Sequence, residues 1–77
     1  MTNFQDRLTN AEANVLTLVE GGLSNQKIAE SMSITVGTVK SHLHRSYEKL
    51  AARNRLDAIT KARARGHFLA SVKSLAP

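Results

Sequence analysis

The 77-residue sequence has no cysteine, and its only proline is the last residue. Without cysteine the chain can form neither a disulfide bond nor a thiolate metal site. No apolar run approaches the roughly 20 residues of a membrane-spanning helix. The first residues, 1–7, also lack a signal-peptide pattern. These absences favour a cytoplasmic protein that does not bind a membrane.

Aromatic residues are few. Tryptophan is absent, and the other aromatic side chains are Phe4, Tyr47 and Phe68. The core must therefore be built from leucine, isoleucine, valine and alanine, as in a small helical bundle. A chain of this length has room for one domain.

Negative charge is scarce in the second half of the chain. Residues 1–39 carry two basic and four acidic side chains, whereas residues 40–77 carry nine basic and two acidic ones. The electrostatic field of a chain whose positive charge lies in one half attracts and orients a polyanion. A surface that only keeps the protein in solution would more often mix the signs. The distribution favours nucleic acid as the partner.

Cap residues predict where four helices begin. Serine, threonine and asparagine side chains accept a free backbone N–H of the first helical turn. Four such residues precede stretches of helical periodicity: Thr9, Ser24, Thr35 and Asn54. Thr9 and Glu12 also match a capping box, in which each side chain bonds the other residue's backbone. Gly21 and Gly22 are expected to end the first helix in left-handed backbone conformations.

The most informative stretch is 24–50, which predicts a short helix, a tight turn and a longer helix. Ser33 and Ile34 are expected to form the turn. The apolar residues of the longer helix follow three- and four-residue steps and predict one buried stripe: Val36, Val39, Leu43, Tyr47 and Leu50. Two helices joined by so short a turn form a helix-turn-helix.

The opposite face of the longer helix carries hydrogen-bond donors and few apolar groups. It consists of Gly37, Lys40, Ser41, His44 and Glu48, with Thr38 and Arg45 along its flank. In a helix-turn-helix the second helix enters the DNA major groove, and its N-terminal residues reach the base edges. The plain alternative is a solvated polar face without a partner.

A fourth helix is predicted over 55–65, where Leu56 and Ile59 are expected to point into the core. Ala58 and Ala62 make a ridge of small residues that would let the same helix of a second copy approach closely. Alternatively, the two alanines are simply good helix formers.

Several blocks of the sequence, in order and at family spacing, resemble the LuxR-type DNA-binding domain, also called the GerE- or FixJ/NarL-type helix-turn-helix. The blocks are Leu8-Thr9-x-x-Glu12, Val15-Leu16-x-Leu18, Gly22-x-Ser24-Asn25-x-x-Ile28-Ala29, Ile34-x-x-x-Thr38-Val39-Lys40-x-His42, Lys49-Leu50 and Arg55-x-x-Ala58-Ile59. The resemblance implies an all-α fold of four helices, with the second and third forming the helix-turn-helix. The implied organisation is an N-terminal arm, the domain and a tail with helical spacing: 1–7, 8–66 and 67–77.

The resemblance also implies a sequence-specific transcription regulator that dimerises through the fourth helix on a two-fold DNA target. Base contacts are implied for four positions of the recognition helix: Gly37, Lys40, Ser41 and His44. Phosphate contacts are implied for Ser24, Asn25, Thr38, His42 and Arg45, with longer-range attraction from Lys27 and Lys49. The implied dimer contact consists of Ala58, Lys61, Ala62 and Arg65. For His42 a position beside the core, with one ring nitrogen bonded to the backbone, is the alternative.

The implied partners are double-stranded DNA, a second copy of the chain and RNA polymerase, in the bacterial cytoplasm and at the nucleoid when bound. No cofactor or metal is implied.

Ala11 departs from the family pattern, because arginine is usual before Glu12, so an ion pair within the domain is missing or replaced. Ser46 stands where an apolar residue is common. Only about seven residues precede the domain, so the chain is a free-standing effector domain or a fragment of a larger regulator.

Two other functions are compatible with the sequence. Region 4 of a sigma factor looks similar over 37–45 and binds promoter DNA as a polymerase subunit, but Ser24-Asn25, His42 and a fourth helix argue against it. A small interaction module could instead pair with a full-length regulator and block it, without any affinity for DNA. Catalysis is not expected, because His42 and His44 point in different directions and no phosphate-binding loop or carboxylate pair is present.

Overall fold

The computed structural model describes residues 7–66, so the predictions for residues 1–6 and for the tail 67–77 lie outside the described residues. Four helices follow in order along the chain: α1 (Asn10–Glu20), α2 (Asn25–Met32), α3 (Val36–Leu50) and α4 (Arg55–Ala64). Over this part of the chain there is no β-strand. The predicted all-α, four-helix fold is therefore confirmed.

All four predicted N-caps are confirmed: Thr9, Ser24, Thr35 and Asn54. The capping box is complete, since the Thr9 hydroxyl accepts from the Glu12 N–H at 3.1 Å and the Glu12 carboxylate accepts from the Thr9 N–H at 2.9 Å. Each cap satisfies a backbone N–H that the helix itself leaves without a partner. The beginnings of the helices are thus fixed by residues next to them in sequence.

The helix ends use left-handed residues, though fewer glycines than expected. Gly22 has a left-handed φ of 92°, but Gly21 has an ordinary right-handed φ of −76°. Only one glycine of the pair therefore adopts the predicted left-handed conformation. Ser33 at φ 58° ends α2, and the Ile34 N–H then bonds the Ala29 carbonyl at 3.0 Å. This turn directs Ile34 back against the core. Ala51, at φ 54°, ends α3 in the same way.

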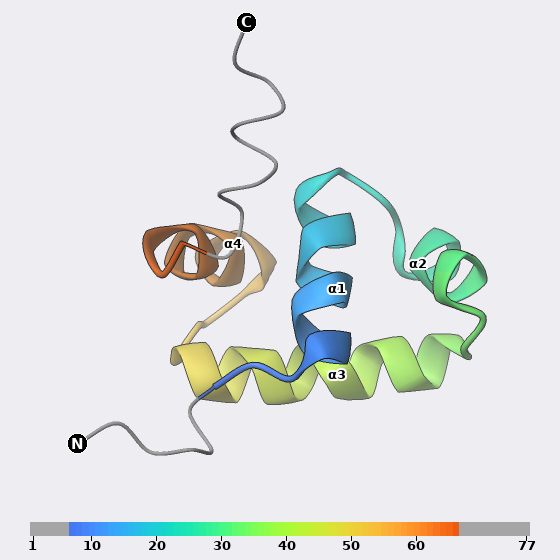
Figure 1. Cartoon of the computed structure of the whole chain (residues 1–77), viewed down its shortest axis with the longest axis horizontal. Coiled ribbons are helices and arrows are strands. Elements are labelled where there is room, and N and C mark those ends of the chain that lie inside the picture. Colours follow the sequence, from blue (N-terminus) through green and yellow to red (C-terminus); the bar gives the residue numbers. More distant parts are fainter. Residues whose placement is uncertain (1–6, 67–77) are drawn as a thin grey trace, which may run out of the picture.

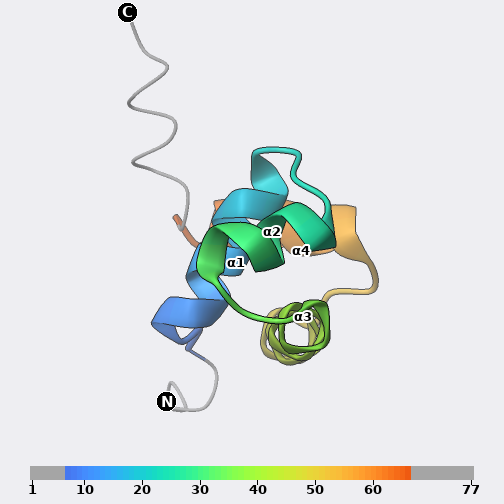
Figure 2. The same cartoon turned by 90° about the vertical axis from the view of Figure 1, so that its right-hand side faces the viewer.

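The three shorter helices lie on one side of α3. In Figure 1, α3 runs along the base of the molecule, and α1 rises from its middle with α2 and α4 on either side. Figure 2 looks along α3 and again places the other helices on one side of it. α3 packs against all of them, and α1 also contacts α2 and α4. One long face of α3 is therefore left without a partner from the described chain.

Every helix contributes to a single core of aliphatic side chains. Its buried members are Val15, Leu16, Val19, Ile28, Ala29, Val39, Leu43, Leu50, Ala58, Ile59 and Ala62. Burying a side chain of the size of leucine or valine stabilises a fold by about 1.5–3 kcal/mol. The core is therefore what holds α3 at a fixed angle to the rest.

The prediction that Leu56 of α4 points into the core is wrong. Leu56 is 75 % exposed rather than in the core, whereas Ala58 and Ala62 are completely buried against the chain's own helices. The buried face of α4 is set by Ala58, Ile59 and Ala62, and Leu56, two residues before Ala58, lies round the helix from it. The two alanines thus pack within the domain, and the dimer contact of Ala58, Lys61, Ala62 and Arg65 stays a prediction.

Glu12 and Lys49 join the start of α1 to the end of α3. The Glu12 side chain is almost entirely buried, and its Oε1 accepts from Lys49 Nζ at 2.7 Å and from the Thr9 N–H. Burial by itself raises the pKa of Glu12, but the hydrogen bonds from Lys49 and Thr9 outweigh it and hold the pKa below its usual value. The pair thus ties the start of α1 to the end of α3 through a buried carboxylate.

Ser46 is accommodated inside the core stripe of α3. It is fully buried, and its hydroxyl donates to the His42 carbonyl at 2.7 Å. Since a buried hydroxyl is costly only when it has no partner, this polar residue can stand at an apolar position. The hydrogen bond comes from the helix's own backbone, so no neighbouring helix has to adapt.

Candidate nucleic-acid interface

The predicted base-reading residues lie together on the free face of α3. Gly37, Lys40, Ser41 and His44 are all exposed, and their spacing of three and four residues puts them on one side of α3. Figure 2 shows that the other helices lie on one side of α3 only. Lys40 and Ser41 make no side-chain hydrogen bond to any residue in the described range 7–66. The structure thus leaves their donors available.

His44 lies near one acidic side chain on the same face. Its Nε2 lies 3.5 Å from Glu48 Oε2, and both side chains are largely exposed. An exposed pair at this separation is weak and is easily exchanged for another partner. Either group can therefore turn towards a ligand on this face.

Glycine at position 37 is not required by the fold. A Cβ placed there would meet one atom nearby, Thr35 Oγ1, at 3.8 Å, which is ordinary van der Waals contact.

Thr35 and Thr38 are joined through their hydroxyls at 2.9 Å, and the Thr38 N–H donates to Thr35 at 3.1 Å. The start of α3 is thus rigidly capped beside an open surface.

The N-terminus of α2 carries the first two predicted phosphate contacts. Ser24 is exposed, and its hydroxyl oxygen accepts from the Lys27 N–H at 3.2 Å. Asn25 is half-buried, and its Oδ1 accepts from Arg55 Nη1 at 2.8 Å. The second nitrogen of that guanidinium, Nη2, donates to the Leu23 carbonyl at 2.7 Å.

Sequence reasoning missed the role of Arg55, which appeared there only as part of a matching block. A signal did exist: a cation at the first residue of a helix is opposed by the helix dipole. Such a residue is expected to have a compensating partner outside its own helix. The structure supplies two of them, on the chain that leads into α2.

The other predicted phosphate contacts differ in how freely they can act. Arg45 is exposed and makes no ion pair with the described residues, while Lys27 lies 3.8 Å from Glu30 in a weak surface pair. The ammonium of Lys49 is turned into the domain towards Glu12, and its side chain is only 21 % exposed. We therefore regard Lys49 as a structural residue.

His42 is half-buried, and its Nδ1 is buried without a hydrogen-bond partner among the described residues. This partial burial is compatible with the alternative prediction, but Nδ1 makes no bond to the backbone of the described residues. A proton on Nδ1 would be buried without an acceptor, which costs free energy. A proton on Nε2 rather than on Nδ1 avoids this cost and gives the ring a donor on its other side.

The two basic residues of the predicted dimer contact hold α4 to the end of α3. Lys61 Nζ donates to the Ala51 carbonyl and lies 3.3 Å from Asp57 Oδ2. Arg65 Nη2 donates to the Lys49 carbonyl at 3.3 Å. Cations at the C-terminal end of α3 are favoured by its dipole. These contacts give both residues a role within the domain.

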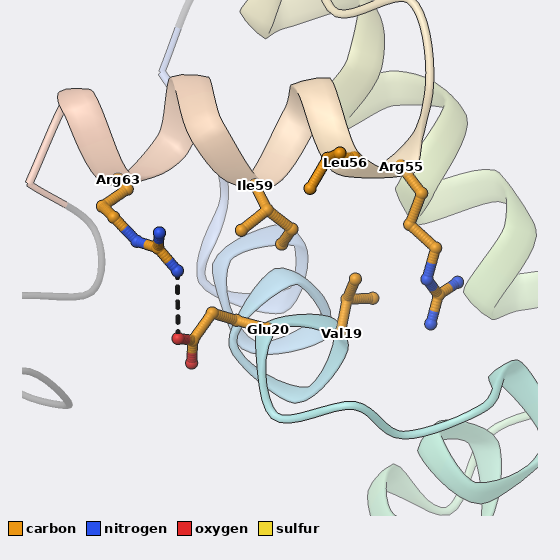
Figure 3. A pocket seen from close by; sticks show the side chains of 6 residues that line it. All are labelled: Val19, Glu20, Arg55, Leu56, Ile59 and Arg63. Atoms are coloured by element: carbon orange, nitrogen blue, oxygen red, sulfur yellow. Dashed lines mark hydrogen bonds and ion pairs between the residues drawn. The ribbon is translucent and has the colours of Figure 1, made fainter.

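A shallow groove of about 430 Å³ separates α4 from the end of α1. Figure 3 shows its lining: Val19 and Glu20 from α1, and Arg55, Leu56, Ile59 and Arg63 from α4. Arg63 Nη2 reaches Glu20 Oε2 at 3.3 Å across one end. At the other end, Arg55 points away from the groove towards the chain that leads into α2.

Two other kinds of site find no support in the described part of the chain. There, no three side chains of histidine, aspartate or glutamate gather as metal ligands would. No helix within residues 7–66 is long and apolar enough to cross a membrane.

Known proteins share this sequence and fold. A family model described as bacterial regulatory proteins, luxR family, matches residues 6–62. The transcriptional regulatory protein DesR of Bacillus subtilis is 41 % identical over 61 residues, which cover 79 % of this chain and 31 % of DesR. The HTH-type transcriptional regulator AlkS of Alcanivorax borkumensis is 39 % identical over 66 residues, 86 % of this chain and 8 % of AlkS.

A solved structure is similar to this chain in both sequence and fold. The response regulator ChrA of a heme-sensing two-component system superposes with a TM-score of 0.76 and 41 % sequence identity, over 79 % of this chain and 30 % of ChrA. The chain thus spans less than a third of the length of each of these relatives. The relatives' names describe regulators of transcription or of two-component systems rather than enzymes. The chain belongs to the luxR family of bacterial regulatory proteins and forms its helix-turn-helix DNA-binding domain.

Proposed function

We propose that this domain binds double-stranded DNA sequence-specifically to regulate transcription, with α3 lying in the major groove. The observation that carries the proposal is the free face of α3, where Lys40, Ser41 and His44 stand exposed on a helix that packs on its other side against three helices. A rigid helix that presents free donors along one face is what direct reading of base edges requires.

The residues of this surface divide into two roles. Lys40, Ser41 and His44, with Gly37 at the groove edge, contact bases and set sequence preference. Ser24, Asn25, Thr38, His42 and Arg45 contact phosphates and fix the position of the domain, with Lys27 adding attraction at longer range. The free donors at the start of α2 and the exposed guanidinium of Arg45 support this division.

Pairing of two copies through α4 is part of the proposal, on a surface different from the alanine ridge. Leu56 is the one large hydrophobic side chain that stands exposed in the described chain, and it borders the groove beside α1. Two copies that meet on this side would cover it, and their recognition helices would then address an inverted repeat. Such a regulator works in the cytoplasm, at the nucleoid, and meets RNA polymerase at the promoter.

The experiment is a titration of a labelled random duplex pool with the protein at several salt concentrations, followed by sequencing of the bound fraction. We expect log K to fall with log salt by about 0.9 for each phosphate contacted. We also expect an enriched inverted repeat with half-sites about one helical turn apart. Lack of binding at low salt would refute the proposal and favour the interaction module that blocks a full-length regulator.

Single variants test the division of roles. Lys40→Ala and His44→Ala should weaken the selected site more than random DNA, because each removes a base contact worth about 1–3 kcal/mol. Arg45→Ala should weaken both alike and lower the salt slope by about 0.9. Arg53→Ala, which removes the same charge from an exposed side chain outside α3, is the control and should leave the slope nearly unchanged. Equal losses on every duplex for all of these variants would contradict the assignment.

A further inference from the structure

Arg55 connects the first turn of α4 to both sides of the α2 N-cap. One nitrogen of its guanidinium donates to the Leu23 carbonyl and another to the side-chain oxygen of Asn25, so Ser24 lies between the two bonded residues. The planar guanidinium can make two such bonds in a fixed geometry, which a lysine ammonium cannot reproduce. The contact therefore fixes a position as well as a charge.

The bond to Asn25 also decides which way its amide group faces. Arginine has donors and no acceptor, so the oxygen of the Asn25 amide must face Arg55. The NH₂ of the same amide then faces away from Arg55, and its two protons are left to donate to another acceptor. Without Arg55 the amide could rotate and present its oxygen instead, which would repel a phosphate.

We propose that Arg55 is a positioning residue for DNA binding, which holds the start of α2 and the donor side of Asn25 ready for a phosphate. The inference rests on the proposed function, since it concerns the phosphate contact assigned there to Ser24 and Asn25. It adds that a residue of α4, with no DNA contact of its own, sets the affinity through α2.

The test compares Arg55→Lys and Arg55→Ala with a matched control, Arg63→Ala. Arg63 also lies on α4 and also joins it to another helix, but through Glu20 of α1 rather than through α2. Binding to the selected duplex is measured well below the melting temperature of every variant. We expect Arg55→Ala and Arg55→Lys each to weaken binding about five- to tenfold, as the loss of one hydrogen bond of ordinary strength would. Arg63→Ala should change binding less than about twofold, as an exposed ion pair suggests.

A double variant separates positioning from a general structural effect. If Arg55 acts through Asn25, Arg55→Ala combined with Asn25→Ala should bind no more weakly than Arg55→Ala alone, because both changes remove the same contact. Combined with Lys40→Ala on α3, the losses should instead add.

Three results would overturn the inference: full affinity in Arg55→Lys, additive losses with Asn25→Ala, or an equal loss in Arg63→Ala. Full affinity in the lysine variant would mean that charge alone acts. In each of these cases the wild-type protein still binds DNA, so the proposed function stands. Failure of the wild-type protein to bind any duplex would instead refute the proposed function itself.

Discussion

The buried ion pair between Glu12 and Lys49 is expected to be the most sensitive polar contact of the domain. We expect Lys49→Met to lower the free energy of unfolding at pH 7 by about 2–3 kcal/mol. Breaking a fully buried pair from one side costs about 3–5 kcal/mol, and the lower figure applies because Lys49 is 21 % exposed and the Thr9 N–H still bonds Glu12. Glu12→Gln should cost less, since its neutral amide can still complete the capping box.

The double variant Glu12→Gln with Lys49→Met should cost less than the two single changes added together, because it leaves neither charge unpaired in the core. The assay is urea denaturation of all four proteins, followed by circular dichroism. Glu30→Ala is the control: it breaks the exposed pair with Lys27 and should cost no more than about 0.5 kcal/mol. Additive costs at positions 12 and 49, or a cost for Lys49→Met as small as that of the control, would refute the reasoning.

Three further outcomes are expected. Gly37→Ala should stabilise α3 by about 0.5–1 kcal/mol, since the fold leaves room for the methyl group, yet it should weaken DNA binding. Thermal melts measure the first effect and fluorescence anisotropy the second, and unchanged affinity would remove Gly37 from the interface. Ala51→Gly should raise the melting temperature by a few degrees, because Ala51 is left-handed, whereas Ala64→Gly within α4 should lower it. Stability should fall as the pH drops below 4.5, because the pKa of Glu12 lies below that value in the folded state and the unfolded chain takes up the proton first. If the free energy of unfolding of Glu12→Gln depended on pH as steeply as that of the wild type, this would be contradicted.

Local signals in the sequence were sufficient for the elements of the fold. Each N-cap bonds a backbone group three residues away, so Thr9, Ser24, Thr35 and Asn54 could be assigned without any tertiary structure. The stripe of α3 was also readable, because its spacing reflects one buried side. Local chemistry thus located the helices to within about a residue.

Contacts between distant residues could not be read in the same way. Lys49 and Arg55 looked like any other basic residues of the second half, but one pairs with Glu12 of α1 and the other with the chain before α2. These partners lie 37 and 30 positions away in sequence. Which cations remain free for DNA depends on such pairings, so charge counting overstates the interface.

Helix α4 shows why a short periodic pattern can mislead. Leu56 and Ile59 are three residues apart and suggest one apolar face, while Ala58 and Ala62 suggest another. In so short a helix the sequence contains both patterns. Packing against α1 and α3 buries Ala58, Ile59 and Ala62 together and leaves Leu56 exposed.

The burial of α4 determines the smallest piece of this chain that can be transplanted. Ala58, Ile59 and Ala62 complete the core, and Lys61 closes the end of α3 by bonding the Ala51 carbonyl. A fusion protein that ended after the helix-turn-helix, at Leu50, would keep every proposed base contact. It would lose α4, which packs against α3 and completes the core behind that helix. Engineers who graft this reader onto another sensor should therefore place the junction outside residues 8–66, on either side.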